Sequence, residues 1–313
     1  MAGSTTRDEL SNVDAGTAVV AALRAIAERL DALEPAALAD EPDAVHQLRT
    51  HVRRLRSVLA AYAPLFDASV AEALHRRYGT FGKELGTVRD IEVRVKVAER
   101  ALQEASEESE AAGVATEMPA GVRARFVDAE LEAYRLAHAR FAERERMPRA
   151  AARRTALAEF LADPSLTPLS AEPAAAVLGD LVEREARRTL RRAKRIGSPA
   201  DTEKLHAVRK AGRRLRYAAE AVTEEPVELF DDGVRALATA GEDLHDLLGD
   251  HRDEVLFVAH LRRYVAHAAH DGEPVDALER LAAAADRRAA DRLGKLDSVV
   301  RDLRHAEHEW ASR

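Results

Sequence analysis

Two stretches of the chain, VHQLRTHVRRLRSVL at 45–59 and LHAVRKAGRRLRYAA at 205–219, share one pattern. In each, an apolar residue precedes His-x-x-Arg-x-x-x-Arg-Arg-Leu-Arg, at an offset of 160 residues. A second motif, Leu-Gly-x-x-Arg-Asp, starts at Leu85 and again at Leu248, at an offset of 163 residues. Two motifs that recur in the same order at nearly equal separation indicate an internal duplication.

Both basic stretches predict amphipathic helices. At 100° per residue, Arg49, Arg53 and Arg56 fall within about 60° of one another, with the apolar residues on another face. Arg209, Arg213 and Arg216 repeat this arrangement in the second copy. We expect the residues of the opposite face to be buried: Val45, Leu48, Val52, Leu55 and Leu59 in the first helix, and Leu205, Val208, Leu215 and Ala219 in the second.

Apolar residues recur at three- and four-residue steps along nearly the whole chain, and aromatic residues are only 4%. This periodicity predicts an all-α fold, which the duplication organises as two similar, pseudo-symmetric helical bundles. The predicted helices are 18–33, 43–62, 68–85, 89–104, 122–144, 149–161, 174–196, 201–222, 227–248, 252–269 and 275–302.

Residues 1–16 are expected to be disordered, and 17–313 to form a single domain of two helical repeats, about 17–163 and 174–313. The boundary is the segment 163–173, which contains three prolines. Residues 101–120 carry five glutamates and no basic residue, and the later part of this segment is interpreted as a solvated loop.

The composition excludes several classes of protein. The 313 residues include no cysteine, which rules out a disulfide framework, thiol catalysis and Cys-based metal sites. No apolar run approaches the roughly 18 residues of a membrane span, and the first ten residues do not resemble a secretion signal. We therefore expect a cytoplasmic protein with no membrane association.

Charge is distributed unevenly along the chain, whose net charge is −7. Residues 45–56 contain four arginines and no acid, and residues 187–216 contain twelve basic residues against two acids. A GC-rich genome explains abundant alanine and arginine, but it does not explain the clustering. Basic segments in an acidic body favour the binding of a polyanion at one place.

Rows of arginine on a helix suit phosphate. Like charges at i, i+3 and i+4 repel, so something has to compensate for them. One possibility is a solvated face neutralised by acids of neighbouring helices. The other is a bound polyanion, because the guanidinium group grips phosphate oxygens with a planar fork and stays charged.

Further candidates surround the two rows. His46 and His206 lie near the predicted helix starts, where free N–H groups attract anions, although each is equally well explained as a structural histidine. The Leu-Gly motif is interpreted as a helix end followed by a new helix, with Arg89 and Arg252 as added cations and Asp90 and Asp253 orienting them or capping the next turn. Three more candidate contacts are Lys83, Arg191 and Arg195.

These motifs, twice in an all-helical chain, resemble those of the CHAD family, the conserved histidine α-helical domain. The resemblance covers nearly the whole chain from about residue 17. It implies two four-helix bundles related by a pseudo-twofold axis, a basic groove that binds inorganic polyphosphate, and association with polyphosphate granules. The family's basic positions correspond here to Arg49, Arg53, Arg54, Arg56, Arg89, Arg209, Lys210, Arg213, Arg214 and Arg216, with the histidines at His46 and His206. Gly212, which interrupts the second basic helix, departs from the pattern.

Three other functions fit parts of the same sequence. Binding of RNA or single-stranded DNA uses the same phosphate contacts, but only Tyr62 and Tyr217 lie close enough in sequence to stack on bases. A metal phosphohydrolase of the HD type is suggested by His206, His245-Asp246 and Asp253. A ferritin-like diiron site is suggested by Glu203-x-x-His206 and Glu242-x-x-His245. The nearby arginines oppose both metal sites. We therefore expect polyphosphate binding without catalysis, cofactor or metal.

Overall fold

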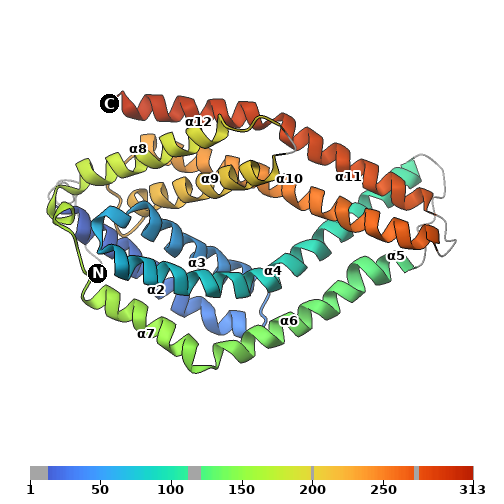
Figure 1. Cartoon of the computed structure of the whole chain (residues 1–313), viewed down its shortest axis with the longest axis horizontal. Helices are drawn as coiled ribbons and strands as arrows, with labels where there is room; N and C mark the ends of the chain where they lie inside the picture. The colour runs from blue at the N-terminus through green and yellow to red at the C-terminus, as the bar shows by residue number, and fades with distance from the viewer. Residues whose placement is uncertain (1–12, 112–120, 199–200, 271–274, 313) are drawn as a thin grey trace. The chain divides into compact units, whose positions relative to one another are not determined.

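The computed structural model describes residues 13–111, 121–198, 201–270 and 275–312, and Figure 1 shows the course of the chain. The regular secondary structure in these ranges consists of helices, without strands, which confirms the predicted all-α class. The helices are α2 (Ala15–Leu38), α3 (Ala44–Ala61), α4 (Ala68–Ala111), α5 (Gly121–Arg123), α6 (Ala129–Glu145), α7 (Pro148–Ala162), α8 (Ala174–Ala193), α9 (Thr202–Thr223), α10 (Asp232–His270), α11 (Asp276–Gly294) and α12 (Leu296–Ala311). A π-helical turn, Ala124–Asp128, joins α5 to α6.

Helix α2 begins at Ala15, inside the segment 1–16 that was expected to be disordered. Asp14 is its N-cap and accepts a hydrogen bond from the backbone N of Thr17 at 2.7 Å, which satisfies one of the free donors of the first turn. Residues 1–12 lie outside the described ranges, as do 112–120, which include most of the predicted acidic loop.

The predicted breaks at the Leu-Gly motifs are wrong. Helix α4 runs without interruption through Leu85-Gly86, and α10 runs through Leu248-Gly249. Glycine costs only about 1 kcal/mol in a helix interior, and neither site carries a proline or a left-handed residue to end the hydrogen-bond ladder. Conversely, the single helix predicted over 275–302 is broken at Lys295 into α11 and α12.

The chain divides into two compact units. Unit 1 comprises residues 1–85, 142–246 and 297–313, and unit 2 comprises 86–141 and 247–296. Each unit takes segments from both predicted repeats, so the units do not coincide with the repeats. The internal duplication and the pair of pseudo-symmetric four-helix bundles stay predictions.

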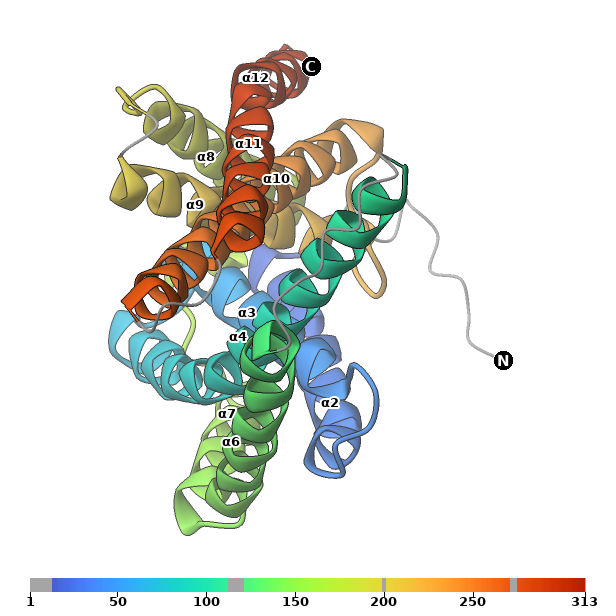
Figure 2. The same ribbon diagram turned by 90° about the vertical axis from the view of Figure 1, so that its right-hand side faces the viewer.

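Unit 1 contains two pairs of packed helices, α2 with α3 and α8 with α9, as Figures 1 and 2 show. Helices α3 and α9 also pack on each other. Their predicted apolar faces are buried throughout: Val52 and Leu55 of α3, and Val208 and Leu215 of α9, are all 0% exposed. The Tyr62 hydroxyl donates to the Ala218 carbonyl at 2.6 Å and adds a buried link between the end of α3 and α9. The two basic helices therefore share one core.

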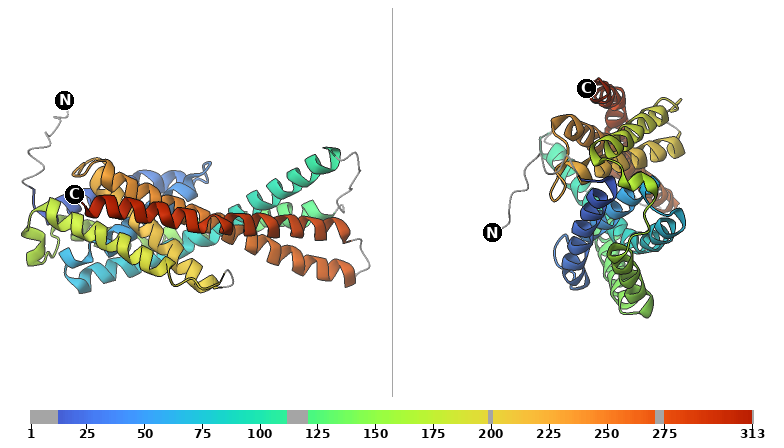
Figure 3. Two further views of the ribbon diagram at one scale, coloured as in Figure 1. Left: turned by 90° about the horizontal axis from the view of Figure 1, so that it is seen from above. Right: turned by 90° about the vertical axis from the view of Figure 1, so that its left-hand side faces the viewer.

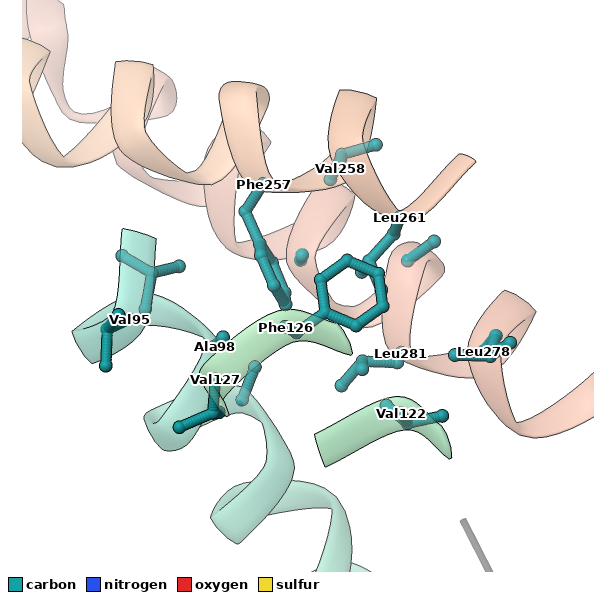
Figure 4. Packing of buried hydrophobic residues seen from close by; sticks show 14 residues of the cluster. Val95, Ala98, Val122, Phe126, Val127, Phe257, Val258, Leu261, Leu278 and Leu281 are labelled. Atoms are coloured by element: carbon teal, nitrogen blue, oxygen red, sulfur yellow. The ribbon is translucent and has the colours of Figure 1, made fainter. Parts of the chain in front are cut away.

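Unit 2 has a separate core. The portion of α10 that belongs to this unit lies beside α11 in Figure 3, and His251 Nδ1 lies 3.0 Å from the Ala289 carbonyl. Phe126 packs edge-on against Phe257, among Val122, Leu261 and Leu281 (Figure 4). Glu254 is fully buried and bonded to arginines of the same unit, Arg100 at 2.5 Å and Arg288 at 3.1 Å. In the described part of the chain, no helix is apolar over the length needed to cross a bilayer.

Candidate anion-binding site

The contact between α3 and α9 gathers five guanidinium groups in unit 1. They come from Arg49, Arg53, Arg56, Arg209 and Arg213, and we call them the central cluster. Arg53 lies close enough to Arg213, Arg49 and Arg209 for their charges to lower its pKa, and Arg213 is affected in the same way by Arg209, Arg56 and Arg49. Both copies of the basic motif thus contribute to one site, because the packing of the apolar faces of α3 and α9 places their basic faces beside each other.

His245 of α10 holds Arg53 in place. Its Nδ1 lies 3.2 Å from the Arg209 carbonyl, and its Nε2 lies 2.9 Å from Arg53 Nη2. Because a carbonyl only accepts, Nδ1 carries the proton and Nε2 accepts from Arg53. Burial and the charges of Arg209, Arg53 and Arg213 lower the pKa of His245 to about 2, so the ring stays neutral. A neutral ring orients Arg53 without cancelling its charge.

Three arginines of the central cluster have no compensating acid in the described ranges. Among the described residues, no carboxylate lies within ion-pair distance of Arg53, Arg56 or Arg213. The Nε atoms of Arg56 and Arg213 are buried and have no hydrogen-bond partner. Arg56 lies over helix α4, where a Cβ added to Gly79 would be 3.4 Å from Arg56 Nη2, so the glycine leaves room for the guanidinium group.

This arrangement is unfavourable without a ligand. Burial lowers the pKa of Arg53 well below that of an exposed arginine, and the neighbouring guanidinium groups lower it further. Burial is also the main cause of the lowered pKa of Arg213. A lowered arginine pKa means that the folded protein disfavours the charged form. A bound anion would supply both the negative charge and the hydrogen-bond acceptors that these arginines lack.

Three other predicted ligands are neutralised by carboxylates. Arg54 pairs with Glu220 at 3.3 Å and also with Glu224, while Arg216 pairs with Glu220 at 2.6 Å and with Glu242 at 2.8 Å. Arg214 Nε donates to Glu185 at 2.6 Å. At these three positions the acid-neutralised face considered from the sequence is what the structure contains.

A second group of cations adjoins Arg214. Burial lowers the pKa of Arg192, and the charges of Arg188, Arg214 and Arg195 lower it further. Burial and the charges of Arg56 and Arg214 likewise lower the pKa of His75, a residue of α4. Arg188 belongs to a basic stripe that the sequence predicts on helix α8, whereas Arg192 and His75 were not predicted. Helical spacing would have grouped Arg188, Arg192 and Arg195, but no local pattern marks His75.

The remaining predicted residues of unit 1 lie at its surface. Lys83 on α4 and Lys210 on α9 are exposed. His46, in the first turn of α3, is partly exposed, and His206 on α9 is exposed. Arg191 lines a surface hollow with Asp180, Glu183, Arg184 and Arg187, separate from the Arg192 group, whereas Arg195 belongs to that group.

The Leu-Gly motif places its polar residues in unit 2. Arg89 pairs with Glu92 at 2.6 Å, and Arg252 lies 3.9 Å from Asp253. Asp90 is exposed, and Asp253 is partly exposed. Because α4 and α10 are continuous here, neither aspartate caps a new helix, and that interpretation is wrong.

Gly212 has a packing role on α9. A Cβ at this position would lie 2.9 Å from the Gly241 carbonyl oxygen, and a Cβ on Gly241 would lie 2.8 Å from the Gly212 carbonyl oxygen. A Cβ atom cannot approach an oxygen this closely, so only glycine at both positions allows the backbones of α9 and α10 to come into contact. The apparent interruption of the basic helix is the feature that brings His245 next to Arg209.

The metal sites weighed from the sequence do not fit the donor atoms. Both ring nitrogens of His245 are engaged by protein groups. Within the described ranges, no three histidine or carboxylate side chains gather as a metal-binding group. Glu242, a proposed diiron ligand, instead pairs with Arg216.

Comparisons with known proteins identify the family. The model of the CHAD domain matches residues 21–262, so the chain belongs to the CHAD domain family. This confirms the resemblance inferred from the two motifs. The chain is 30% identical over 258 residues to "Uncharacterized protein MT2285" of Mycobacterium tuberculosis strain CDC 1551 / Oshkosh and to "Uncharacterized protein Rv2226" of strain ATCC 25618 / H37Rv. That alignment covers 80% of this chain and 46% of each relative, so the chain spans about half the length of the curated relatives it matches.

Solved structures share the fold. The CHAD domain from the plant Ricinus communis is similar, with a TM-score of 0.68 and 22% identity, over 94% of this chain and 93% of that one. PptA from Streptomyces chartreusis is similar with a TM-score of 0.66 and 22% identity, over 94% of this chain and 99% of that one.

Proposed function

We propose that this protein binds inorganic polyphosphate at the central cluster, without catalysing its cleavage. The observation that carries the proposal is the set of partly buried guanidinium groups of Arg53, Arg56 and Arg213, which have no carboxylate partner among the described residues. Linear polyphosphate supplies one negative charge per small repeating unit, and it can follow several arginines along a helix without needing space for bases.

The surroundings of the cluster favour polyphosphate over nucleic acid. Tyr62 is 0% exposed and Tyr217 is 5% exposed, so neither offers a free ring face to a base. Sequence-independent nucleic-acid binding usually combines basic side chains with exposed aromatic rings. The second group of cations, around Arg192 and Arg214, can support a chain that continues past Arg56.

The absence of catalysis is part of the proposal. Cleavage of a phosphoanhydride needs a positioned nucleophile or a metal, whereas the histidine of the cluster, His245, already donates to Arg209 and accepts from Arg53. Granule association follows as a cellular expectation, because a protein that holds polyphosphate collects where the polymer is stored.

A competition experiment tests the ligand. Labelled long-chain polyphosphate is bound to the protein and displaced with unlabelled polyphosphate, single-stranded RNA or single-stranded DNA at equal phosphate concentration. We expect polyphosphate to displace the label far more effectively. Equal displacement by RNA or DNA would overturn the assignment in favour of general phosphate-backbone binding.

Variants locate the site. Replacing Arg53 or Arg213 with methionine should weaken polyphosphate binding by roughly tenfold to a hundredfold each, since a hydrogen bond to a charged group contributes about 1.5–3 kcal/mol. Arg301→Met is the matched control, because Arg301 is an exposed arginine on α12 of the same unit. Unchanged affinity in both cluster variants, with native circular dichroism, excludes the central cluster as the site.

A further inference from the structure

We propose that Glu220 and Glu224 act as an internal competitor of the phosphate ligand: they occupy Arg54 and Arg216 and so restrict binding to the central cluster. This inference rests on the proposed function and concerns which of the repeated arginines the ligand reaches. Arg54 and Arg216 belong to the same repeated motif as Arg53 and Arg213, so the sequence does not distinguish them as ligands and their exclusion has to come from tertiary contacts.

Glu220 bridges the two basic helices. Its Oε1 accepts from Arg216 Nε of its own helix at 2.6 Å, and its Oε2 lies 3.3 Å from Arg54 Nη2 of α3. The Glu220 side chain is only 12% exposed, and burial raises its pKa while the hydrogen bond from Arg216 and the charges of Arg54 and Arg216 lower it. One carboxylate therefore contacts two arginines through its two oxygens, as two nonbridging oxygens of a phosphate group would.

Glu224 closes the exposed side of the same contact. It follows Glu220 by one helical turn at the C-terminal end of α9, and it accepts from Arg54 Nη2. Its side chain is 50% exposed, so the pair forms where a solvent-borne anion could otherwise reach Arg54. Glu242 of α10 adds a third carboxylate, 2.8 Å from Arg216.

There is room for a ligand beside Arg54 if the carboxylates are neutralised. A cavity of about 240 Å³ is lined by Arg29, His51 and Arg54 together with Glu220, Glu224 and Glu225. In the present charge state three acids face two arginines in this cavity, which repels a polyanion. With glutamines at 220 and 224, the same cavity becomes cationic and continues the row of arginines on α3.

The experiment measures polyphosphate affinity as a function of salt for Glu224→Gln, Glu242→Gln and the double variant Glu220→Gln/Glu224→Gln. Each additional phosphate contact should steepen the slope of log K against log salt by about 0.7, which is about fivefold in affinity at 0.1 M salt. We expect Glu224→Gln to gain up to one such contact and the double variant up to two. If the double variant fails to fold, Glu224→Gln alone still tests the inference, because the Glu224 side chain is half exposed and its replacement should not disturb the fold.

Glu203→Gln is the matched control. It removes the same charge from the same helix, at an exposed position in the first turn of α9. A long-range effect of net charge would appear equally in this control, whereas a local effect would not. The gain from Glu224→Gln should also disappear when Arg54 is replaced by glutamine in the same chain, since the gain is expected to act through Arg54.

The outcomes separate this inference from the proposed function. If the wild-type protein binds polyphosphate through Arg53 and Arg213 but the glutamine variants bind no better than Glu203→Gln, the competitor role is refuted and the proposed function stands. If only the glutamine variants bind, the competitor role is supported and the proposed function of the wild-type protein fails. Absence of binding by all of them refutes both.

Discussion

Arg213 and Arg216 lie three residues apart on α9, yet their surroundings are opposite in character. Arg213 is surrounded by other guanidinium groups and has a buried Nε without a partner, whereas Arg216 is held by two carboxylates. Burying an uncompensated charge is unfavourable for folding, and breaking a paired charge is also unfavourable. The two residues therefore make opposite contributions to the stability of the free protein.

We predict that Arg213→Met raises and Arg216→Met lowers the melting temperature in the absence of polyanions. Each change should amount to about 1 kcal/mol, which is about 2–4 °C for a chain of this size. Differential scanning calorimetry in low-phosphate buffer measures both. A loss of stability in Arg213→Met equal to that in Arg216→Met would mean that Arg213 has a compensating partner.

His75 should report on binding through its pKa. Burial and the charges of Arg56 and Arg214 lower the pKa of this ring in the free protein. A bound polyanion offsets those charges and should raise the His75 pKa. Because the bound state then takes up a proton more readily, affinity should increase as the pH falls from 8 towards 6.

Histidine NMR with and without polyphosphate measures this shift. His245 is the internal comparison: its pKa of about 2 keeps it neutral over the whole range, so its ring should not titrate in the free protein. A His75 pKa that is the same in both states would place the ligand away from Arg56 and Arg214.

At the scale of the helix, the contact between α9 and α10 depends on paired glycines. We predict that Gly241→Ala destabilises the protein by about 1–3 kcal/mol, because its Cβ would overlap the Gly212 carbonyl oxygen and the Arg216 backbone. Gly294→Ala is the control: a Cβ there meets nothing within 4 Å, and alanine is the better helix former. Thermal unfolding of both variants checks the prediction, and equal destabilisation would contradict it.

Much of the helical architecture could be predicted from the sequence, because burial follows local periodicity. The buried faces of α3 and α9 follow from patterns within about 15 residues. The basic groove was expected only from the family resemblance, because no local pattern brings together helices whose motifs are 160 residues apart. The continuity of α4 and α10 could not be predicted, since a single glycine is a weak signal in a helix. The partners of the arginines could not be predicted either: Glu185 is 29 residues from Arg214, and Glu224 is 170 residues from Arg54.

At the scale of the whole molecule, the two compact units should separate stability from binding. Glu254 of unit 2 is fully buried and bonded to Arg100 and Arg288. We predict that Glu254→Gln costs about 1.5–3 kcal/mol of unfolding free energy, because it removes the charge that accepts hydrogen bonds from the partly exposed Arg100 and Arg288. Polyphosphate affinity, measured at a temperature where the variant is folded, should stay within about twofold of wild type.

The control for that prediction is Arg213→Met, which should weaken binding while the protein stays folded. Denaturant titration gives the unfolding free energy, and isothermal titration calorimetry gives the affinity. A large loss of affinity in the folded Glu254→Gln protein would show that the ligand site depends on the ion pairs of unit 2.

The glycine pair on α9 and α10 has a consequence for how finely the site is built. The backbones of α9 and α10 are in direct contact at these glycines. A rotation or translation of one helix against the other would therefore make backbone atoms overlap or would open a gap. The contact thereby fixes the position of His245 on α10 relative to Arg209 and Arg213 on α9. Two glycines, which have no side-chain functional group, thus limit how far the residues of the site can shift relative to one another.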